Sequence, residues 1–126
     1  MNRPILIVDD EPANLALLRQ ILSPEYALVF ARNGGEALAA VAKHHPALVL
    51  MDVEMPGMDG YTACRALKAD PATESIPVIF VTSLAETGDE TAGFDAGAVD
   101  YLVKPVSPPI VRARVRTHLS LVSAKQ

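Results

Sequence analysis

The sequence predicts an α/β fold in which a parallel sheet is covered by helices on both faces. Five apolar, strand-like runs are separated by segments long enough for a helix and two short loops. The run at 47–52 is apolar up to its last residue, Asp52, as expected for a strand buried on both sides. Three other runs also end on polar side chains, at Asp9, Thr82 and Lys104. Open α/β sheets bind ligands at the carboxyl ends of their strands. The carboxyl-terminal end of the sheet, here called the mouth, is therefore the expected functional site.

Composition narrows the class of protein. A chain of 126 residues with 50% hydrophobic content fits one domain with a sizeable core. Its net charge of -4 argues against direct contact with nucleic acid or an anionic membrane surface. No apolar run approaches the roughly 20 residues of a membrane span, and no signal peptide is evident, so a soluble, cytoplasmic protein is expected. Cys64 is the single cysteine, and its apolar neighbours predict packing rather than redox chemistry.

The first half of the chain predicts two strand and helix pairs. Pro12 suits a first helical turn, and Leu15, Leu18 and Leu22 fall on one helix face. Adjacent histidines cannot share a helix face as metal ligands, so His44-His45 is expected to be a solvated helix end. The expected elements are a strand at 5–8, a helix at 12–22, a strand at 26–31, a turn at Asn33-Gly34 and a helix ending near residue 44.

The second half continues the alternation. Asp59 is expected to cap a third helix and Ser107 a last one, with Pro108 at its first position. The segment 86–97 contains three glycines, each costing up to ~1 kcal/mol in a helix, so it predicts the weakest helix and the natural candidate for movement. The expected elements are strands at 47–52, 77–82 and 99–103, and helices at about 60–69, 86–97 and from 108 onward.

Five short motifs at the predicted strand ends carry a resemblance to a known family. They are Asp9-Asp10, Asp52 followed by Met55-Pro56-Gly57, Thr82-Ser83, Gly97-Ala98, and Tyr101 with Lys104-Pro105. In this order they resemble the receiver domain of two-component response regulators, over essentially the whole chain. The resemblance implies a flavodoxin-like, doubly wound, five-stranded parallel sheet of order 2-1-3-4-5, with five helices on its two faces. Residues 1–126 would form one receiver (phosphoacceptor) domain, either stand-alone or the N-terminal part of a longer response regulator.

The resemblance also implies a metal site. Three crowded carboxylates repel one another unless a cation is present, and a hard divalent ion suits an all-oxygen site. By resemblance the ion is Mg²⁺, with Mn²⁺ as a substitute. Asp10 and Asp52 would bind it directly, Asp9 largely through water, and Glu54 through its backbone carbonyl.

The implied chemistry is phosphoryl transfer to Asp52 from a phosphohistidine on a sensor histidine kinase or a histidine phosphotransfer protein. Lys104, the Thr82 hydroxyl and backbone amides near Ser83 would stabilise the transferred charge. The chain would thus be a phosphoacceptor that catalyses only its own phosphorylation and dephosphorylation, not an autonomous enzyme. As a switch, Thr82 would shift towards the phosphoryl group and Tyr101 would turn inward from a more exposed position.

Two further points concern the surface that passes on the signal and whether the protein depends on phosphorylation. The expected output surface is the fourth helix, fifth strand and fifth helix, acting on an output domain or effector protein. A homodimer formed on phosphorylation is expected there, because acids and arginines face each other: Glu86, Asp89, Glu90 and Asp95 against Arg112, Arg114 and Arg116. The alternative is a receiver-like protein-interaction module that works without phosphorylation, which the full set of acids, Thr82 and Lys104 argues against.

Overall fold

The computed structural model describes residues 3–83 and 94–124. Five parallel strands form one sheet in the order β2-β1-β3-β4-β5, which confirms the expected α/β class and strand order. The elements within the described residues are β1 (Ile5–Val8), α1 (Pro12–Leu22), β2 (Leu28–Ala31), α2 (Gly34–His44), β3 (Leu48–Asp52), α3 (Gly60–Ala69), β4 (Val78–Thr82), β5 (Asp100–Val103) and α5 (Pro108–Ala124).

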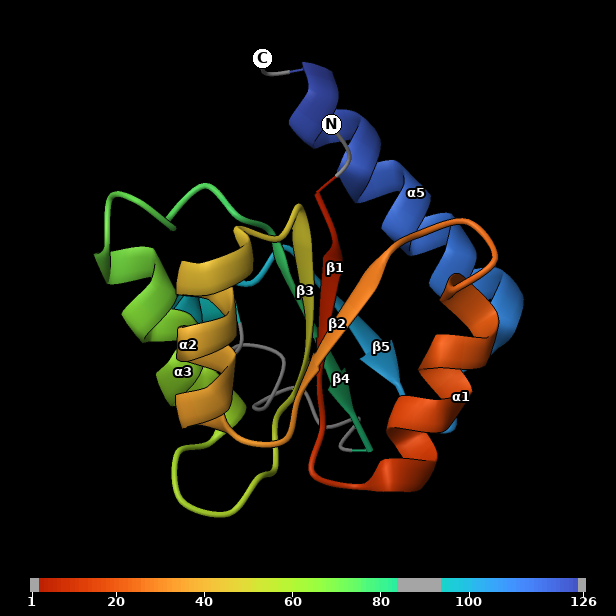
Figure 1. The fold of residues 1–126 in the computed structure, drawn as a ribbon, viewed down its shortest axis with the longest axis horizontal. Helices are drawn as coiled ribbons and strands as arrows, with labels where there is room; N and C mark the ends of the chain where they lie inside the picture. Colours follow the sequence, from red (N-terminus) through yellow and green to blue (C-terminus); the bar gives the residue numbers. More distant parts are fainter. Residues whose placement is uncertain (1–2, 84–93, 125–126) are drawn as a thin grey trace.

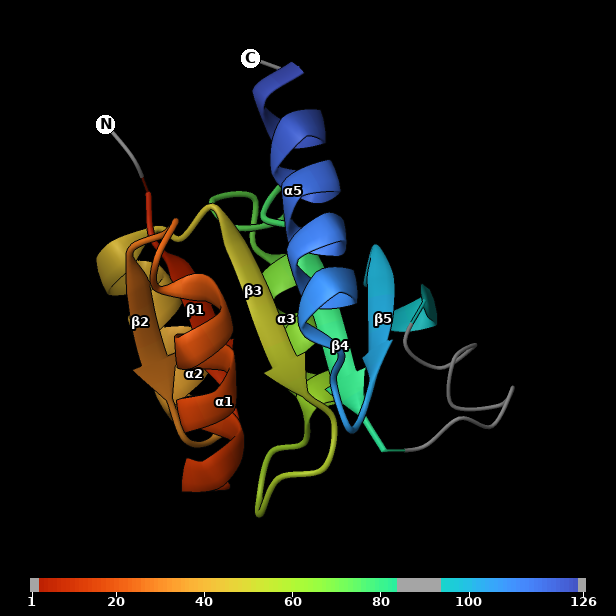
Figure 2. The same ribbon diagram turned by 90° about the vertical axis from the view of Figure 1, so that its right-hand side faces the viewer.

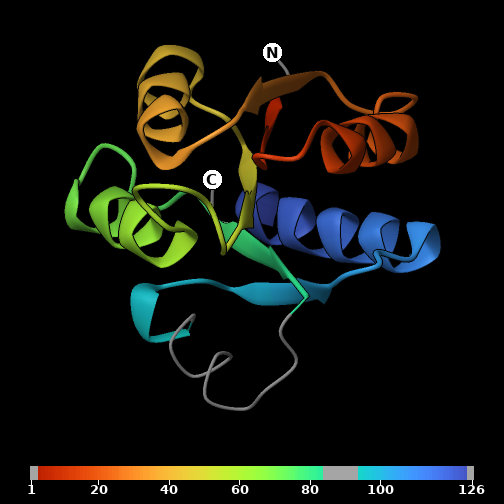
Figure 3. The same ribbon diagram turned by 90° about the horizontal axis from the view of Figure 1, so that it is seen from below.

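The molecule has three layers. Figure 1 shows α2 and α3 on one face of the sheet and α1 and α5 on the other, and Figure 3 shows the same layers from below. Figure 2 shows that α5 extends beyond the strands at the end of the sheet opposite the mouth. None of the helices in residues 3–83 and 94–124 is both long and apolar enough to cross a membrane.

Alternating side chains of the strands build two separate cores. On β1, Leu6 and Val8 join the core under α2 and α3, whereas Ile5 and Ile7 join the core under α1 and α5. This period of two follows from the pleat of a strand, and burial on both faces explains why β3 and β4 read as continuous apolar runs.

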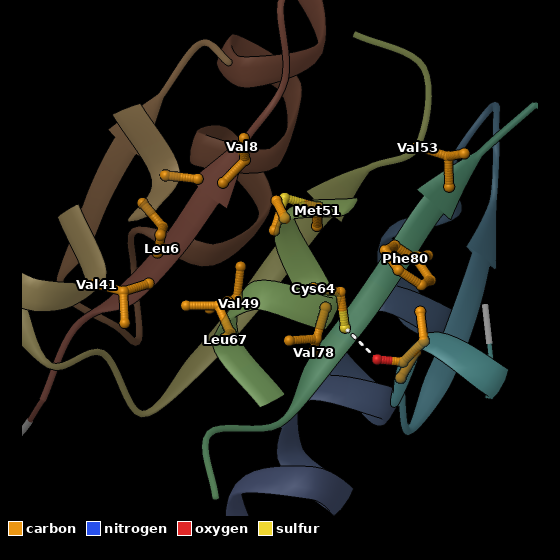
Figure 4. Packing of buried hydrophobic residues seen from close by; sticks show 14 of the residues in the cluster. Leu6, Val8, Val41, Val49, Met51, Val53, Cys64, Leu67, Val78 and Phe80 are labelled. Atoms are coloured by element: carbon orange, nitrogen blue, oxygen red, sulfur yellow. Dashed lines mark hydrogen bonds between the residues drawn. The ribbon is translucent and has the colours of Figure 1, made fainter. Parts of the chain in front are cut away.

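Figure 4 shows the core under α2 and α3, where Cys64 packs between Val78 and Phe80. The Cys64 thiol is buried and donates a hydrogen bond to the Ala96 carbonyl oxygen at 3.4 Å. Burial raises the pKa of this thiol, although the charges of Lys68 and Arg65 partly offset the effect. The predicted packing role of Cys64 is confirmed.

Most helix ends follow the sequence signals. Asp59 caps α3 by accepting a hydrogen bond from the Thr62 amide at 2.8 Å. α2 ends at His44, and His45 adopts a left-handed conformation with φ 46°, so this pair is an exposed helix end as expected. α5 begins at Pro108, as expected.

Three boundaries differ from the expectation. Asn33-Gly34 is not a separate turn, because Asn33 caps α2 by accepting from the Glu36 amide, and Gly34 is already helical. β2 begins at Leu28, opposite Ile5, rather than at residue 26, because β1 offers it no earlier ladder partner. Of the predicted helix at 86–97, residues 86–93 lie outside the described residues, and residues 94–96 are helical.

Candidate functional site

Strand register brings two aspartates side by side at the mouth. The β1–β3 ladder pairs Val8 with Met51, so the next residues, Asp9 and Asp52, leave neighbouring strands at the same level. Both are buried, with exposed fractions of 1% and 4%. Asp10 is half-buried, and one oxygen from each of the three carboxylates lies within 4.8 Å of the others. The predicted cluster of acids therefore exists.

Lys104 supplies the positive charge of the site. The β4–β5 ladder pairs Thr82 with Val103, and the Lys104 amide donates to the Thr82 carbonyl oxygen at 2.8 Å. Its side chain crosses the mouth, so that Nζ lies 3.3 Å from Asp52 Oδ1 and 3.2 Å from Asp9 Oδ2. One ammonium group thus bridges carboxylates from two different strands.

One carboxylate oxygen of Asp9 accepts no hydrogen bond from the described residues. Its Oδ1 accepts a hydrogen bond from the Glu11 amide at 2.9 Å, which fixes the carboxylate at the start of α1. Its Oδ2 is buried and accepts no hydrogen bond among the described residues, since the Lys104 ammonium is at ion-pair distance without hydrogen-bond geometry. A buried carboxylate oxygen that is short of donors is costly. The donor set therefore fits a hard divalent cation, which carboxylate oxygens bind well.

Burial and charge shift the ionisation of the two central groups. Burial, together with the negative charge of Asp9, raises the pKa of Asp52 from 3.8 to about 6, although Lys104 opposes the rise. Burial alone would lower the pKa of the Lys104 ammonium, but the carboxylates of Asp52 and Asp9 raise it above its usual value. The lysine therefore stays charged, whereas Asp52 without a cation is an unusually basic carboxylate.

The remaining predicted site residues lie around this cluster. Thr82 is buried at the end of β4, and Ser83 is exposed immediately after it. The Glu54 side chain is exposed and is not among the three clustered carboxylates, Asp9, Asp10 and Asp52. Asp10 is not the N-cap of α1, because that position is taken by Glu11, which makes no side-chain cap.

Gly60 is a positioning residue that the sequence did not single out. A Cβ at this position would collide with the Asp52 carbonyl oxygen, so only glycine lets α3 begin this close to β3. The Gly60 amide also donates to the Val53 carbonyl oxygen at 2.8 Å. The one available signal was the Asp59-Gly60 pair directly after the loop, where Asp59 predicted a helix start.

Tyr101 lies on β5, away from the carboxylates. It is 9% exposed, with its ring 5.8 Å from that of Phe80 and 5.4 Å from that of Phe94. In this structure Tyr101 therefore occupies an inward position, the one that the family resemblance implies for the phosphorylated state.

The fold and the mouth together define a doubly wound, flavodoxin-like α/β protein with a lysine-bridged cluster of carboxylates. The profile of the response regulator receiver domain matches residues 5–116. The chain belongs to this family, whose members act in two-component signalling and typically are phosphorylated and bind Mg²⁺.

Two curated relatives and one solved structure illustrate the similarity. A probable cyclic di-GMP phosphodiesterase of Vibrio cholerae is 49% identical over 115 residues, covering 91% of this chain and 26% of that protein. The response regulator PleD of Caulobacter vibrioides is 48% identical over 118 residues, covering 93% of this chain and 26% of PleD. The receiver domain of a Pseudomonas aeruginosa sensor histidine kinase, solved with a magnesium ion coordinated in its active-site cleft, is 28% identical with a TM-score of 0.87, covering 95% and 99% of the two chains. The chain thus spans about a quarter of the length of these two curated relatives.

Proposed function

We propose that Asp52 accepts a phosphoryl group from a phosphohistidine of a sensor histidine kinase or histidine phosphotransfer protein. An Asp52 carboxylate oxygen attacks phosphorus, the bond from phosphorus to the histidine nitrogen breaks, and the imidazole leaves with the electron pair. The observation that carries the proposal is the bridge from Lys104 Nζ to both Asp52 and Asp9 at the mouth. The bridge supports the proposal because a fixed cation beside the attacking oxygen can stabilise the negative charge of the incoming phosphoryl oxygens.

Asp9, Asp10 and Asp52 are the groups that would hold Mg²⁺, or Mn²⁺ in its place, together with the Glu54 backbone carbonyl. The lack of a hydrogen bond to Asp9 Oδ2 and the crowding of three carboxylates support this assignment. When bound, the ion supplies positive charge that offsets the repulsion between the carboxylates and the incoming phosphoryl oxygens. The solved relative with magnesium in its cleft is consistent with the same use of this chain's residues.

Lys104 and Thr82 are proposed to contact the transferred phosphoryl group, with backbone amides near Ser83 as further donors. Thr82 lies one residue beyond Val81, which pairs with Asp52 across the β3–β4 ladder. Its movement towards the added charge would be coupled to Tyr101, whose inward ring would then be held by phosphorylation. Crystals of unmodified and beryllofluoride-bound protein test this coupling, because an identical Tyr101 rotamer in both would contradict it.

The output is proposed to act through β5, α5 and the segment before β5. Large apolar side chains there are about half exposed, among them Phe94, Val103 and Ile110. Because the chain spans about a quarter of two regulators that it resembles, the proposed context is the N-terminal receiver of a longer cytoplasmic regulator that controls an output domain. Similarity to a probable cyclic di-GMP phosphodiesterase makes an enzyme of that class one candidate output. The receiver itself would catalyse only its own phosphorylation and dephosphorylation.

The direct test is the intact mass of the protein after incubation with acetyl phosphate and Mg²⁺. One added phosphoryl group is expected for the wild type and none for Asp52→Asn. Asp59→Asn is the matched control, because it removes a carboxylate from the following loop yet keeps a side-chain oxygen for the α3 cap. If the wild type gains no mass under any donor, the phosphorylation-independent interaction module becomes the better account.

A further inference from the structure

A groove lies between α1 and β2, which is an edge strand of the sheet. Figure 2 shows these two elements side by side. Its cavity volume is about 280 Å³. The lining residues are four apolar ones and two arginines: Pro12, Leu15, Ala16, Phe30, Arg19 and Arg32. The groove contains none of the proposed phosphoacceptor, metal or switch residues.

The floor of the groove is an unusual apolar surface. Phe30 pairs with Ile7 in the β1–β2 ladder, yet its side chain is 41% exposed, whereas Ile7 is fully buried. Leu15 is only partly buried, and Ala16 is exposed. A large aromatic ring that a strand presents beside open helix surface is typical of a contact residue at an interface.

The charge on the groove is opposite to that of the protein. The chain carries a net charge of -4, but no acidic residue lines this cavity. Within the part of the chain that the structure describes, neither the Arg19 nor the Arg32 guanidinium makes an ion pair. The Glu36 carboxylate accepts from the Arg32 backbone amide at 2.9 Å and leaves the guanidinium available.

The groove begins next to the mouth. Pro12 follows Asp10 by two residues, and Arg32 directly follows the carboxyl end of β2. The opposite edge of the sheet is β5, so the β5 part of the proposed output surface is separated from the groove by the width of the sheet, although α5 packs beside α1 on the same face. A partner could therefore occupy both the groove and the neighbourhood of the carboxylates while leaving β5 free.

We propose that this groove docks an acidic segment of a partner protein that carries one large apolar side chain. The apolar side chain would cover Phe30 and Leu15, and carboxylates on either side of it would pair with Arg19 and Arg32. Arginine and aromatic residues dominate binding energy at many interfaces. Here Phe30 is partly exposed, and Arg19 and Arg32 make no ion pair among the described residues. The docking does not require phosphorylation, so a failed docking test would leave the proposed phosphoacceptor role of Asp52 unaffected.

Amide NMR titration of the whole chain tests the proposal. The probe is a synthetic peptide with a central Phe between two pairs of Glu, and its comparison is the same peptide with Lys in place of Glu. The Glu peptide is expected to shift amides of residues 12–19 and 30–32. Arg19→Glu and Arg32→Glu are each expected to weaken binding by roughly fivefold, and addition of salt should weaken it as well.

Two control variants separate docking from general effects. Arg65→Glu makes the same charge change on the exposed surface of α3 and should leave the affinity unchanged. Phe30→Ala should weaken binding while the remaining amide spectrum stays that of a folded protein. Equal shifts with the Lys peptide, shifts confined to residues 103–110, or an Arg65→Glu effect equal to that of Arg19→Glu would overturn the proposal. Shifts of the groove amides on raising protein concentration without peptide would assign the groove to a second copy instead.

Discussion

Asp52 owes its chemistry to residues that reach it from several elements. Asp9 lies beside it on β1, Lys104 reaches it from the end of β5, and Gly60 lets α3 begin against its carbonyl oxygen. The resulting carboxylate is buried, crowded by like charge and only partly neutralised by one ammonium group. At the scale of single residues, the site is therefore electrostatically unfavourable until a cation offsets the charge of the carboxylates.

The first prediction concerns this electrostatic cost in metal-free protein. Because the pKa of Asp52 rises from 3.8 in the unfolded chain to about 6, its ionisation between those two values lowers the free energy of unfolding as pH rises. Asp52→Asn should therefore be more stable than the wild type by about 3 kcal/mol at pH 8, a difference that largely disappears towards pH 4. Urea unfolding in excess chelator at both pH values measures this. A less stable variant at pH 8 would refute the proposed electrostatic cost.

The second prediction concerns the division of labour between the two adjacent acids. Asp9 Oδ1 is committed to the Glu11 amide and Oδ2 lies beside Lys104, whereas Asp10 is more open to solvent. Asp10→Ala should therefore weaken Mg²⁺ binding by more than roughly tenfold, and Asp9→Ala by less. Amide NMR titration with MgCl₂ is the readout, because the chain contains no tryptophan. Wild-type affinity in Asp10→Ala would show that the ligand assignment is wrong.

At the scale of elements, β5 is joined to α5 by one carboxylate. Asp100 Oδ1 lies 2.7 Å from Arg114 Nη1, and Asp100 Oδ2 lies 2.9 Å from His118 Nε2. Burial alone would raise the pKa of Asp100, but hydrogen bonds from His118, the Tyr101 amide and Arg114 hold it below its ordinary value. Arg114, which the charge pattern of the sequence predicts to contact a second copy, pairs with Asp100 of its own chain in this structure.

The third prediction follows from that pair. A carboxylate with a lowered pKa contributes stability above its unfolded pKa of 3.8, and the contribution is lost as pH falls through the folded value. Asp100→Asn should lower the free energy of unfolding by about 1 kcal/mol at pH 7, a modest value because Arg114 is 44% exposed. The deficit should narrow below pH 4. Urea unfolding is the measurement, and a deficit that persists unchanged at pH 3 would contradict the assignment.

The elements also mark what the sequence could predict. Where the sequence predicted a boundary, the strands and helices within the described residues begin or end within two residues of it, because buried parallel strands and capped amphipathic helices leave strong local patterns. β2 is shorter than its apolar run, because its length depends on β1, a partner remote in sequence. The polar residues at the mouth were predicted from the order of the five motifs and from their resemblance to the receiver family. The double contact of Lys104 and the role of Gly60 depend on distances that no local pattern encodes.

At the scale of the whole molecule, the acidic mouth and the exposed apolar surface of β5 and α5 lie on neighbouring parts of one rigid sheet. Val103 belongs to that surface and precedes Lys104, so the lysine and the surface share one strand end. A charge added at Asp52 would therefore act on Lys104, whose neighbour Val103 is half exposed within the proposed output surface. This arrangement gives the proposed switch a short path from chemistry to output.

The fourth prediction concerns assembly. Beryllofluoride with Mg²⁺ should convert the protein from monomer to dimer through the surface of β5 and α5, and Ile110→Glu should prevent the conversion by placing charge in an apolar contact. Light scattering at high protein concentration measures the mass. An unchanged monomer mass would favour a receiver that acts on a separate partner.

The central claim is that Asp52 is the phosphoacceptor, and chemical mapping of the modified residue tests it most directly. Borohydride reduces an aspartyl phosphate to homoserine, a change that peptide mass spectrometry assigns to a single position. After phosphorylation by acetyl phosphate with Mg²⁺, homoserine is predicted at position 52 and at no other aspartate. Homoserine at position 9 or 10 with Asp52 intact would contradict the account.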